Sequence, residues 1–157
     1  MTDGGQRAAT VTAAVSAAVI IAQQVGGKAI RDALFLSTFA PTDLPKVMVG
    51  AAVLSIGAAL CMSRVIAVRG PGRTVSLTLG ASAALFLLEW FLFERLPDAV
   101  AVLVYLHTSV FSGLAISGFW TVVNERFDPH AARRVVGAIG AGAAFGGAVG
   151  GVVAQQV

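Results

Sequence analysis

The sequence predicts an all-α membrane protein with five transmembrane helices, and its composition carries this prediction. Hydrophobic residues make up 57% of the 157 residues and charged residues only 12%, whereas a soluble domain carries about 25% charged residues. The apolar residues gather in long runs, and about 20 of them let a helix cross a hydrocarbon core roughly 30 Å thick. No stretch alternates in polarity over enough residues to indicate a β-barrel.

The first predicted helix covers residues 10–38 and follows the short polar sequence MTDGGQR. Its apolar segment is longer than the hydrophobic region of a signal peptide, so we interpret it as a retained transmembrane helix. The sequence APTDLPK comes next, and Pro41 and Pro45 are expected to break the helix there. The second helix is predicted over residues 44–68.

Short sequences rich in glycine, proline or charge separate the remaining helices. RGPGRT precedes a third helix over residues 74–93, and ERLPD precedes a fourth over residues 99–123. The fourth helix ends at NERFDPH, where Asp128 is expected to cap the fifth helix and Pro129 to occupy its first turn. The fifth helix is predicted over residues 131–157.

The predicted fifth helix is still apolar where the sequence stops at Val157. We therefore expect residues 1–157 to form a single transmembrane domain that is the truncated, N-terminal portion of a longer transporter. The remaining helices of that transporter, or soluble domains encoded downstream, are then its expected partners. A self-contained protein of five helices is the alternative.

The distribution of basic residues predicts how the helices are oriented, because cytoplasmic loops carry an excess of Lys and Arg. One side of the membrane holds Arg7, Arg64, Arg69, Arg73, Arg126, Arg133 and Arg134, and the other holds Lys46 and Arg95. The sequence therefore predicts an integral, multi-pass protein with a cytoplasmic N-terminus. Orientation also explains the net charge of +3, so membrane lipids are expected partners and nucleic acid is not.

Three charged residues, Lys28, Arg31 and Asp32, lie inside the apolar stretch of the first predicted helix. A charged side chain at the bilayer centre costs roughly 2.5–3.5 kcal/mol, so it needs a partner or a water-filled cavity. Lys28 and Asp32 are spaced to pair on one helix face, which leaves Arg31 without a partner on its own helix. Arg31, helped by Lys28, is then expected to bind a small anionic solute. The alternative is that both cations snorkel to the lipid headgroups.

Small residues recur at a fixed spacing in the fifth predicted helix. Glycines four residues apart let two helix backbones approach closely in lipid, which indicates helix packing and a helix able to slide or rock during gating. The tract has no lysine and no preceding strand, so a phosphate-binding P-loop is not expected. The glycines in this pattern are Gly142, Gly146, Gly147, Gly150 and Gly151.

The fourth predicted helix contributes two further candidates for substrate binding, His107 and Asn124. His107 and its neighbour Thr108 are placed to face a cavity, although a lone histidine in a helix is more often packed and hydrogen-bonded than part of a ligand site. Glu89 is expected near the outer interface without a functional role. Arg69, Arg73, Arg133 and Arg134 of the cytoplasmic loops are expected to set the topology. For Arg133 and Arg134, contact with lipid phosphates, a ligand or an acidic partner is the alternative.

The sequence gives no indication of enzymatic chemistry. No nucleophile with a neighbouring base, no pair of catalytic carboxylates and no cluster of metal ligands is present, so neither an enzyme, a metal ion nor a cofactor is expected. Cys61, the single cysteine, lies in an apolar run and rules out a disulfide framework.

Two segments together resemble a known family. The run Lys28-Ala-Ile-Arg31-Asp32-Ala-Leu and the phrase FWTVVNERFDPHAARRVVGAIGAG are similar to the nucleotide (ATP:ADP) antiporters of plastids and intracellular bacteria, and more closely to their free-living bacterial relatives. The resemblance covers nearly the whole chain, yet only five of about twelve helices of a major-facilitator-like fold. RGPGRT also resembles part of the basic loop motif between helices two and three, and GAAFGGAVGG resembles the glycine motif of antiporter helix five.

This resemblance implies a secondary transporter of the bacterial inner membrane that exchanges ATP, ADP or related phosphorylated anions. In these antiporters a basic-x-x-basic-Asp pattern is implicated in nucleotide binding, and Lys28, Arg31 and Asp32 match it, with Arg31 where lysine is usual. The acidic residue that the family carries in helix four has no counterpart around His107. A transporter of a non-nucleotide solute and a non-transporting membrane anchor or sensor for fused cytoplasmic domains are therefore retained as alternatives.

Overall fold

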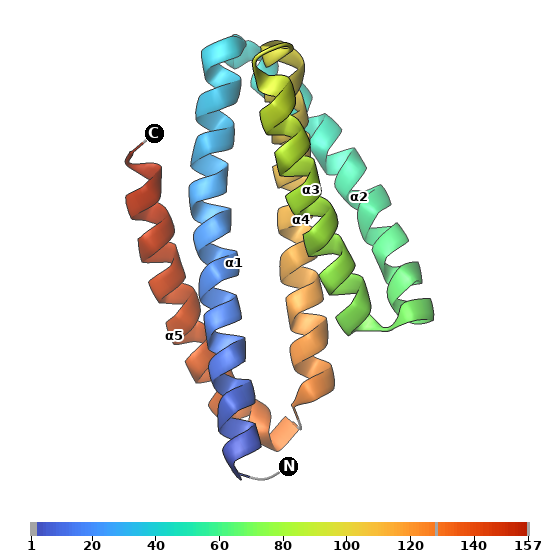
Figure 1. Ribbon diagram of the computed structural model, residues 1–157, viewed down its shortest axis with the longest axis vertical. Helices are drawn as coiled ribbons and strands as arrows, with labels where there is room; N and C mark the ends of the chain where they lie inside the picture. Colours follow the sequence, from blue (N-terminus) through green and yellow to red (C-terminus); the bar gives the residue numbers. More distant parts are fainter. Residues whose placement is uncertain (1–2, 128, 157) are drawn as a thin grey trace. The chain divides into compact units, whose positions relative to one another are not determined.

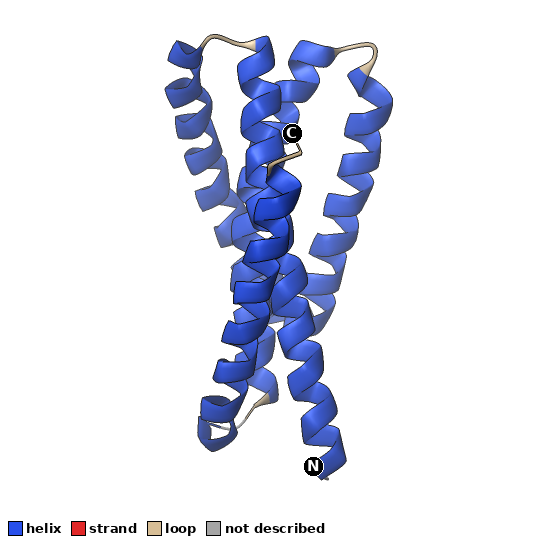
Figure 2. Cartoon of the chain, turned by 90° about the vertical axis from the view of Figure 1, so that its left-hand side faces the viewer, coloured by secondary structure: helices blue, strands red, loops and turns tan. Residues whose placement is uncertain are grey.

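The computed structural model describes residues 3–127 and 129–156, and every long element among them is an α-helix (Figure 2). The helices are α1 (Asp3–Thr38), α2 (Leu44–Arg69), α3 (Pro71–Phe93), α4 (Pro97–Arg126) and α5 (Pro129–Ala154), with a short 3-10 helix, η1 (Pro41–Asp43), before α2 (Figure 1). Within the described residues, all five contain a segment long and apolar enough to span a membrane. The prediction of an all-α protein with five such helices is confirmed.

The helix bounds differ most from the prediction at the beginning of α1, which starts at Asp3 rather than at residue 10. The prediction was based on apolar residues and therefore left out this mostly polar segment. The segment is still helical, because its Ala, Gln and Arg residues favour an α-helix. The hydroxyl of Thr10 donates a hydrogen bond to the carbonyl oxygen of Gln6, as expected inside a continuous helix. The described α1 therefore extends beyond the apolar span.

The connection between α2 and α3 is much tighter than the predicted loop RGPGRT. Gly70 alone separates the two helices, with a φ of 77° that L side chains rarely adopt. Pro71 is the first residue of α3, where the missing N–H is not needed. Pro45 likewise lies in the first turn of α2, which begins at Leu44 as predicted, and the expected break before the second helix falls between Thr38 and Leu44. Asp128, the predicted cap, lies outside the described residues.

The contacts between residues divide the chain into two compact units. Unit 1 comprises Met1–Gly27 and Phe119–Val157, and unit 2 comprises Lys28–Gly118. The long helices α1 and α4 each contribute to both units. Unit 1 therefore contains most of α1 together with α5, whereas unit 2 contains α2, α3 and the charged end of α1.

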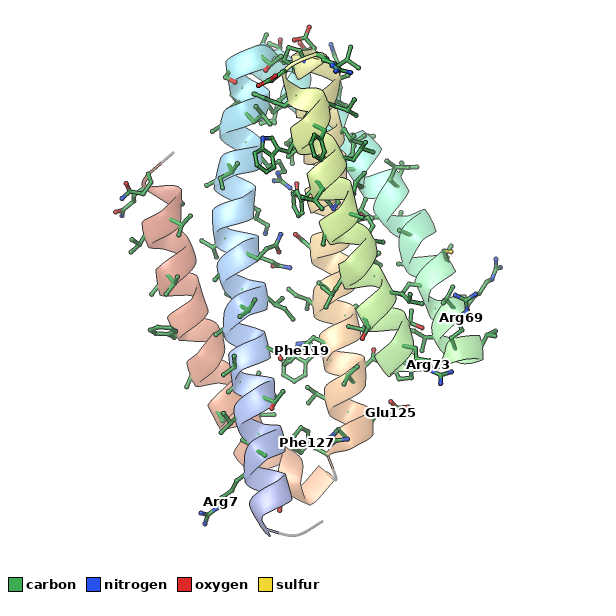
Figure 3. All side chains as sticks on the ribbon, in the orientation of Figure 1. Arg7, Arg69, Arg73, Phe119, Glu125 and Phe127 are labelled. Atoms are coloured by element: carbon green, nitrogen blue, oxygen red, sulfur yellow. The ribbon has the colours of Figure 1, made fainter. Side chains whose placement is uncertain are left out.

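Unit 1 is held together by close packing of α5 on α1, which lie side by side in Figure 1. A Cβ atom added at Gly142, Gly146 or Gly150 would collide with the α1 backbone, at Ala14, Ala18 and Ala22 respectively. Side chains from α1, α5 and the segment after Phe119 form the core beside this contact. Its buried members are Ala13, Ala17, Val123, Phe127, Val135 and Ile139, and Figure 3 shows Phe119 and Phe127 on the same side of their segment.

Unit 2 has its own core, built where the end of α1 meets α4. Phe35 stacks on Phe39 with 4.9 Å between ring centroids and contacts Tyr105 of α4 at 5.2 Å. Ala51 of α2 completes the buried cluster. Gly118 of α4 lies so close to α2 and α3 that an added Cβ would come within 2.7 Å of Val75 and 2.9 Å of Met62. These contacts fix the section of α4 that carries the polar residues described next.

Candidate functional site

Arg31 is the centre of a polar cluster between α1 and α4 in unit 2. Its Nε donates a hydrogen bond to Oδ1 of Asp32 at 2.9 Å, and its Nη1 donates to the hydroxyl of Ser109 at 2.7 Å. The guanidinium carbon lies 4.3 Å from the ring centroid of Tyr105. The Arg31 side chain is 13% exposed and that of Asp32 is 45% exposed. The guanidinium is therefore held by one anion, one hydroxyl and one aromatic face.

Helix periodicity explains why these groups meet. Arg31 and Phe35 are four residues apart on α1, and Tyr105 and Ser109 are four residues apart on α4, so each pair shares one helix face. Arg31 contacts Tyr105 and Ser109, while Phe35 contacts Tyr105. Ser109 in turn donates to the carbonyl oxygen of Tyr105 at 2.6 Å, which fixes its hydroxyl oxygen as the acceptor for Arg31.

The expected pairing of Lys28 with Asp32 is wrong. Asp32 pairs instead with the adjacent Arg31, and within the described residues no ion pair forms at Lys28, which is exposed. The reason is tertiary, because Ser109 and Tyr105 hold the guanidinium beside the Asp32 carboxylate. The arginine that lacked a predicted partner is thus the best-partnered residue of the three.

The depth of the cluster along the helices bears on the snorkelling alternative. α1 continues for seven residues after Arg31, to Thr38, which is roughly 10 Å of helix. Ser109 lies twelve residues after Pro97, the first residue of α4, or roughly 18 Å into that helix. The guanidinium therefore points sideways onto α4 rather than toward the end of its own helix.

Arg31 keeps hydrogen-bonding capacity for a ligand. A guanidinium has five N–H donors in a planar fork, and the hydrogen bonds to Asp32 and Ser109 engage two of them. The planar fork suits the oxygens of a phosphate or carboxylate group, and contact with an aromatic ring strengthens the hold on the cation. The arrangement can bind an anion without first reorganising the arginine.

A second polar cluster in unit 2 joins α3 to α4. Nδ1 of His107 lies 2.9 Å from Oε1 of Glu89, and Nε2 lies 2.9 Å from the hydroxyl of Ser82. The rings of Phe86 and Phe111 flank the imidazole at centroid distances of 4.3 and 4.9 Å. The side chains of His107 and Glu89 are both almost completely buried. Glu89 was expected near the outer interface, but its side chain is buried and lies beside His107.

The other predicted site residues are not members of these two clusters. Asn124 belongs to unit 1 and is exposed. Arg69 and Arg73 flank the turn between α2 and α3 (Figure 3). The side chains of Arg133 and Arg134 lie outside the described part of the chain. Of the glycines, Gly147 has room for a side chain, because an added Cβ would lie 3.7 Å from the side chain of Ile21, and an atom added at Gly151 meets nothing within 4 Å among the described residues.

Sequence reasoning missed Tyr105, Ser109, Ser82 and Glu89 as members of polar clusters. Helix spacing carried part of the signal, because Ser82 and Glu89 are seven residues apart and therefore lie on the same face of α3. The pairing of that face with His107 depends on how α3 and α4 pack. In the described residues no group of three or more His, Cys, Asp or Glu side chains is placed to hold a metal ion.

Comparison with protein-family models, with curated proteins and with solved structures finds no match to this chain. The multi-pass membrane character therefore rests on the five apolar helices of the described chain. The polar clusters inside those helices are the basis for a functional assignment.

Proposed function

We propose that this multi-pass membrane protein is part of a secondary transporter for a small phosphorylated anion, with ATP and ADP as its expected cargo. The observation that carries the proposal is the placement of Arg31. Its guanidinium lies inside a helix long and apolar enough to span the membrane, and Asp32, Ser109 and Tyr105 hold it there. Ionisable residues in such helices are costly and typically mark solute pathways.

The charges of the cluster around Arg31 suit a site that must bind a solute and then release it. Asp32 balances the charge of Arg31 when no solute is bound, so the Arg31–Asp32 pair is electrically neutral in the empty site. An incoming phosphate competes with the half-exposed Asp32 carboxylate for the guanidinium and uses its remaining donors. Such an exchange of partners keeps binding weak enough for release, which alternating access requires.

Nucleotides are the proposed cargo because the run from Lys28 to Asp32 resembles the nucleotide antiporters. Lys28 is exposed on the same helix as Arg31, so a chain of phosphates has a second cation within one helical turn. A solute with a single anionic group needs Arg31 alone. Affinity that rises with the number of phosphates therefore separates a nucleotide transporter from a transporter of another anion.

An uptake experiment tests the proposed function. The protein as its gene encodes it is reconstituted into liposomes, and uptake of radiolabelled ATP, ADP, inorganic phosphate and a non-phosphorylated dicarboxylate is measured with and without internal ATP. We expect saturable ATP uptake that internal ATP accelerates. Uptake of the dicarboxylate but no phosphorylated solute supports a transporter of another anion, and absence of flux for every solute contradicts transport and supports a membrane anchor or sensor.

The proposed orientation, with a cytoplasmic N-terminus, predicts which turns react with a membrane-impermeant thiol reagent in intact cells. In a Cys61→Ser background, Ala40→Cys between α1 and η1 should be labelled from outside. Gly72→Cys, beside the turn between α2 and α3, should be labelled only after the cells are permeabilised. The Cys61→Ser protein is the unlabelled control, and the reverse pattern at both positions contradicts the proposed orientation.

A further inference from the structure

Glu89 and His107 form a buried pair that the proposed anion site does not use. The side chains of His107 and Glu89 are 0% and 2% exposed, and the Nδ1–Oε1 distance is 2.9 Å. The second carboxylate oxygen of Glu89, Oε2, is buried and has no hydrogen-bond partner among the described residues. A strong acceptor is therefore left unsatisfied between two apolar helices, which in a native protein demands an explanation.

The number of protons on the pair decides whether it carries a net charge. With Glu89 ionised and His107 neutral, Nδ1–H donates to Oε1 and the pair is negative. One additional proton, on the imidazole or on Oε2, makes the pair neutral overall. Ser82 suits either state, because its hydroxyl can donate to a neutral Nε2 or accept from a protonated one. Burial strongly disfavours the negative state.

Charged groups on the neighbouring helices do not replace that proton. On α1, Arg31 and Asp32 bind each other, and their contacts on α4 are Ser109 and Tyr105. On α2, Cys61 is the titratable side chain that lines the same apolar groove as His107. Among the described residues none of these groups hydrogen bonds to the pair.

The other titratable groups on α3 and α4, the helices that carry the pair, do not balance its charge either. Tyr105 of α4 faces Arg31 and Phe35 of α1. Glu94, Arg95 and Asp98 lie at or beside the turn between α3 and α4. Among the described residues none of them, the Arg95 cation included, hydrogen bonds or forms an ion pair with Glu89 or His107. Within the described chain, a proton is therefore the one charge-balancing partner that the pair can take up without rearrangement.

We propose that Glu89 and His107 share one exchangeable proton and form the site that couples solute movement to a transmembrane proton gradient. The shared proton depends only on Glu89 and His107, whereas the coupling to solute movement rests on the proposed function. With α3 and α4 packed as described, the proton stays on the pair and cancels its charge. When a conformational change admits water to Oε2, hydration stabilises the ionised pair and the proton passes to water as H⁺, with no other bond made or broken.

The shared proton is tested by spectroscopy on the protein in liposomes. Difference infrared spectra and ¹⁵N-histidine solid-state NMR spectra are recorded as the pH is raised from neutral. We expect either a carboxylic acid band or an imidazolium signal from His107, lost on deprotonation and absent from Glu89→Gln. A neutral His107 beside an ionised Glu89 already at neutral pH overturns the shared proton. His107→Gln, which removes the other partner, distinguishes the two carriers.

Glu89→Gln is chosen because the amide has the size of the protonated acid and keeps an oxygen for Nδ1. Its thermal unfolding in detergent should match that of the unmodified protein, since the pair is neutral in both. Glu94→Gln, at the end of α3, removes a carboxylate that lies outside the pair and serves as the matched control. If Glu89→Gln fails to fold and His107→Gln folds normally, the spectroscopic and uptake tests are made with His107→Gln.

The coupling is tested by solute uptake into liposomes with an imposed pH gradient. We expect the gradient to drive net uptake in the unmodified protein and in Glu94→Gln, and Glu89→Gln to lose this response while still exchanging external for internal solute. Anion flux that is indifferent to the gradient overturns the coupling and leaves the proposed function intact. Absence of anion flux from the unmodified protein, with a normally titrating pair, overturns the proposed function and the coupling together.

Discussion

Replacing Gly146 by leucine is expected to separate α5 from α1 in unit 1. A Cβ atom at this position overlaps the backbone of Ala18, including its carbonyl oxygen. A backbone atom in a helix cannot rotate aside as a side chain can, so the two helices must move apart and lose their contact. Overpacking of a folded core costs about 1–3 kcal/mol, and we expect the upper end of that range. The measurement is thermal unfolding of the purified protein in detergent.

Gly140→Leu is the matched control, because it makes the same change on the same helix. An atom added at Gly140 meets nothing within 4 Å among the described residues, so the leucine should be accommodated with little change in unfolding temperature. Gly146→Ala should give a smaller version of the Gly146→Leu effect, since one methyl group suffices for the overlap. Equal unfolding temperatures for Gly146→Leu and Gly140→Leu would contradict the close packing of α5 on α1.

Replacing Arg31 by glutamine is expected to abolish binding and uptake of the anionic solute without preventing membrane insertion. The change removes the positive charge and the planar fork, while Asp32 stays half exposed and able to be hydrated. A hydrogen bond to a charged group contributes about 1.5–3 kcal/mol. Because 1.4 kcal/mol is about a tenfold change in affinity, loss of even one such bond weakens solute binding at least about tenfold.

Two further variants separate the geometry of Arg31 from its charge. Arg31→Lys keeps the charge without the fork, so it should retain part of the uptake with a raised KM. Lys46→Gln removes an exposed cation that pairs with Asp43 at the start of α2, outside the cluster, and should transport normally. Uptake by Arg31→Gln at the level of Lys46→Gln would show that Arg31 does not bind the solute.

The five helices were predictable because each contains a predominantly apolar stretch of about 20 residues, and a spanning helix needs little more than that. Their ends were less predictable where polarity and helix propensity disagree. The beginning of α1 is polar yet helical, and the loop expected around Pro71 is reduced to Gly70 because proline suits the first turn of α3. Length and hydropathy thus determine that these helices exist, and local backbone chemistry determines where they end.

The glycine pattern of α5 was also visible in the sequence, but only the packing shows which of these glycines contact α1. Gly142, Gly146 and Gly150 lie against the α1 backbone, whereas Gly151 has open space beside it among the described residues. Gly147 and Gly151 have the same spacing of four residues as Gly142, Gly146 and Gly150, so the spacing alone does not distinguish a contact face from a free one. The position of the neighbouring helix makes that distinction.

The sequence by itself determined that this is a multi-pass α-helical protein with Lys28, Arg31 and Asp32 inside its first helix, because such properties are local to one segment. Only the tertiary structure decided the partners of the charges. It replaced the expected pair of Lys28 and Asp32 by a cluster around Arg31, and it joined Glu89 to His107. Both outcomes depend on which faces of two helices meet, and that choice is made by packing across the whole of unit 2.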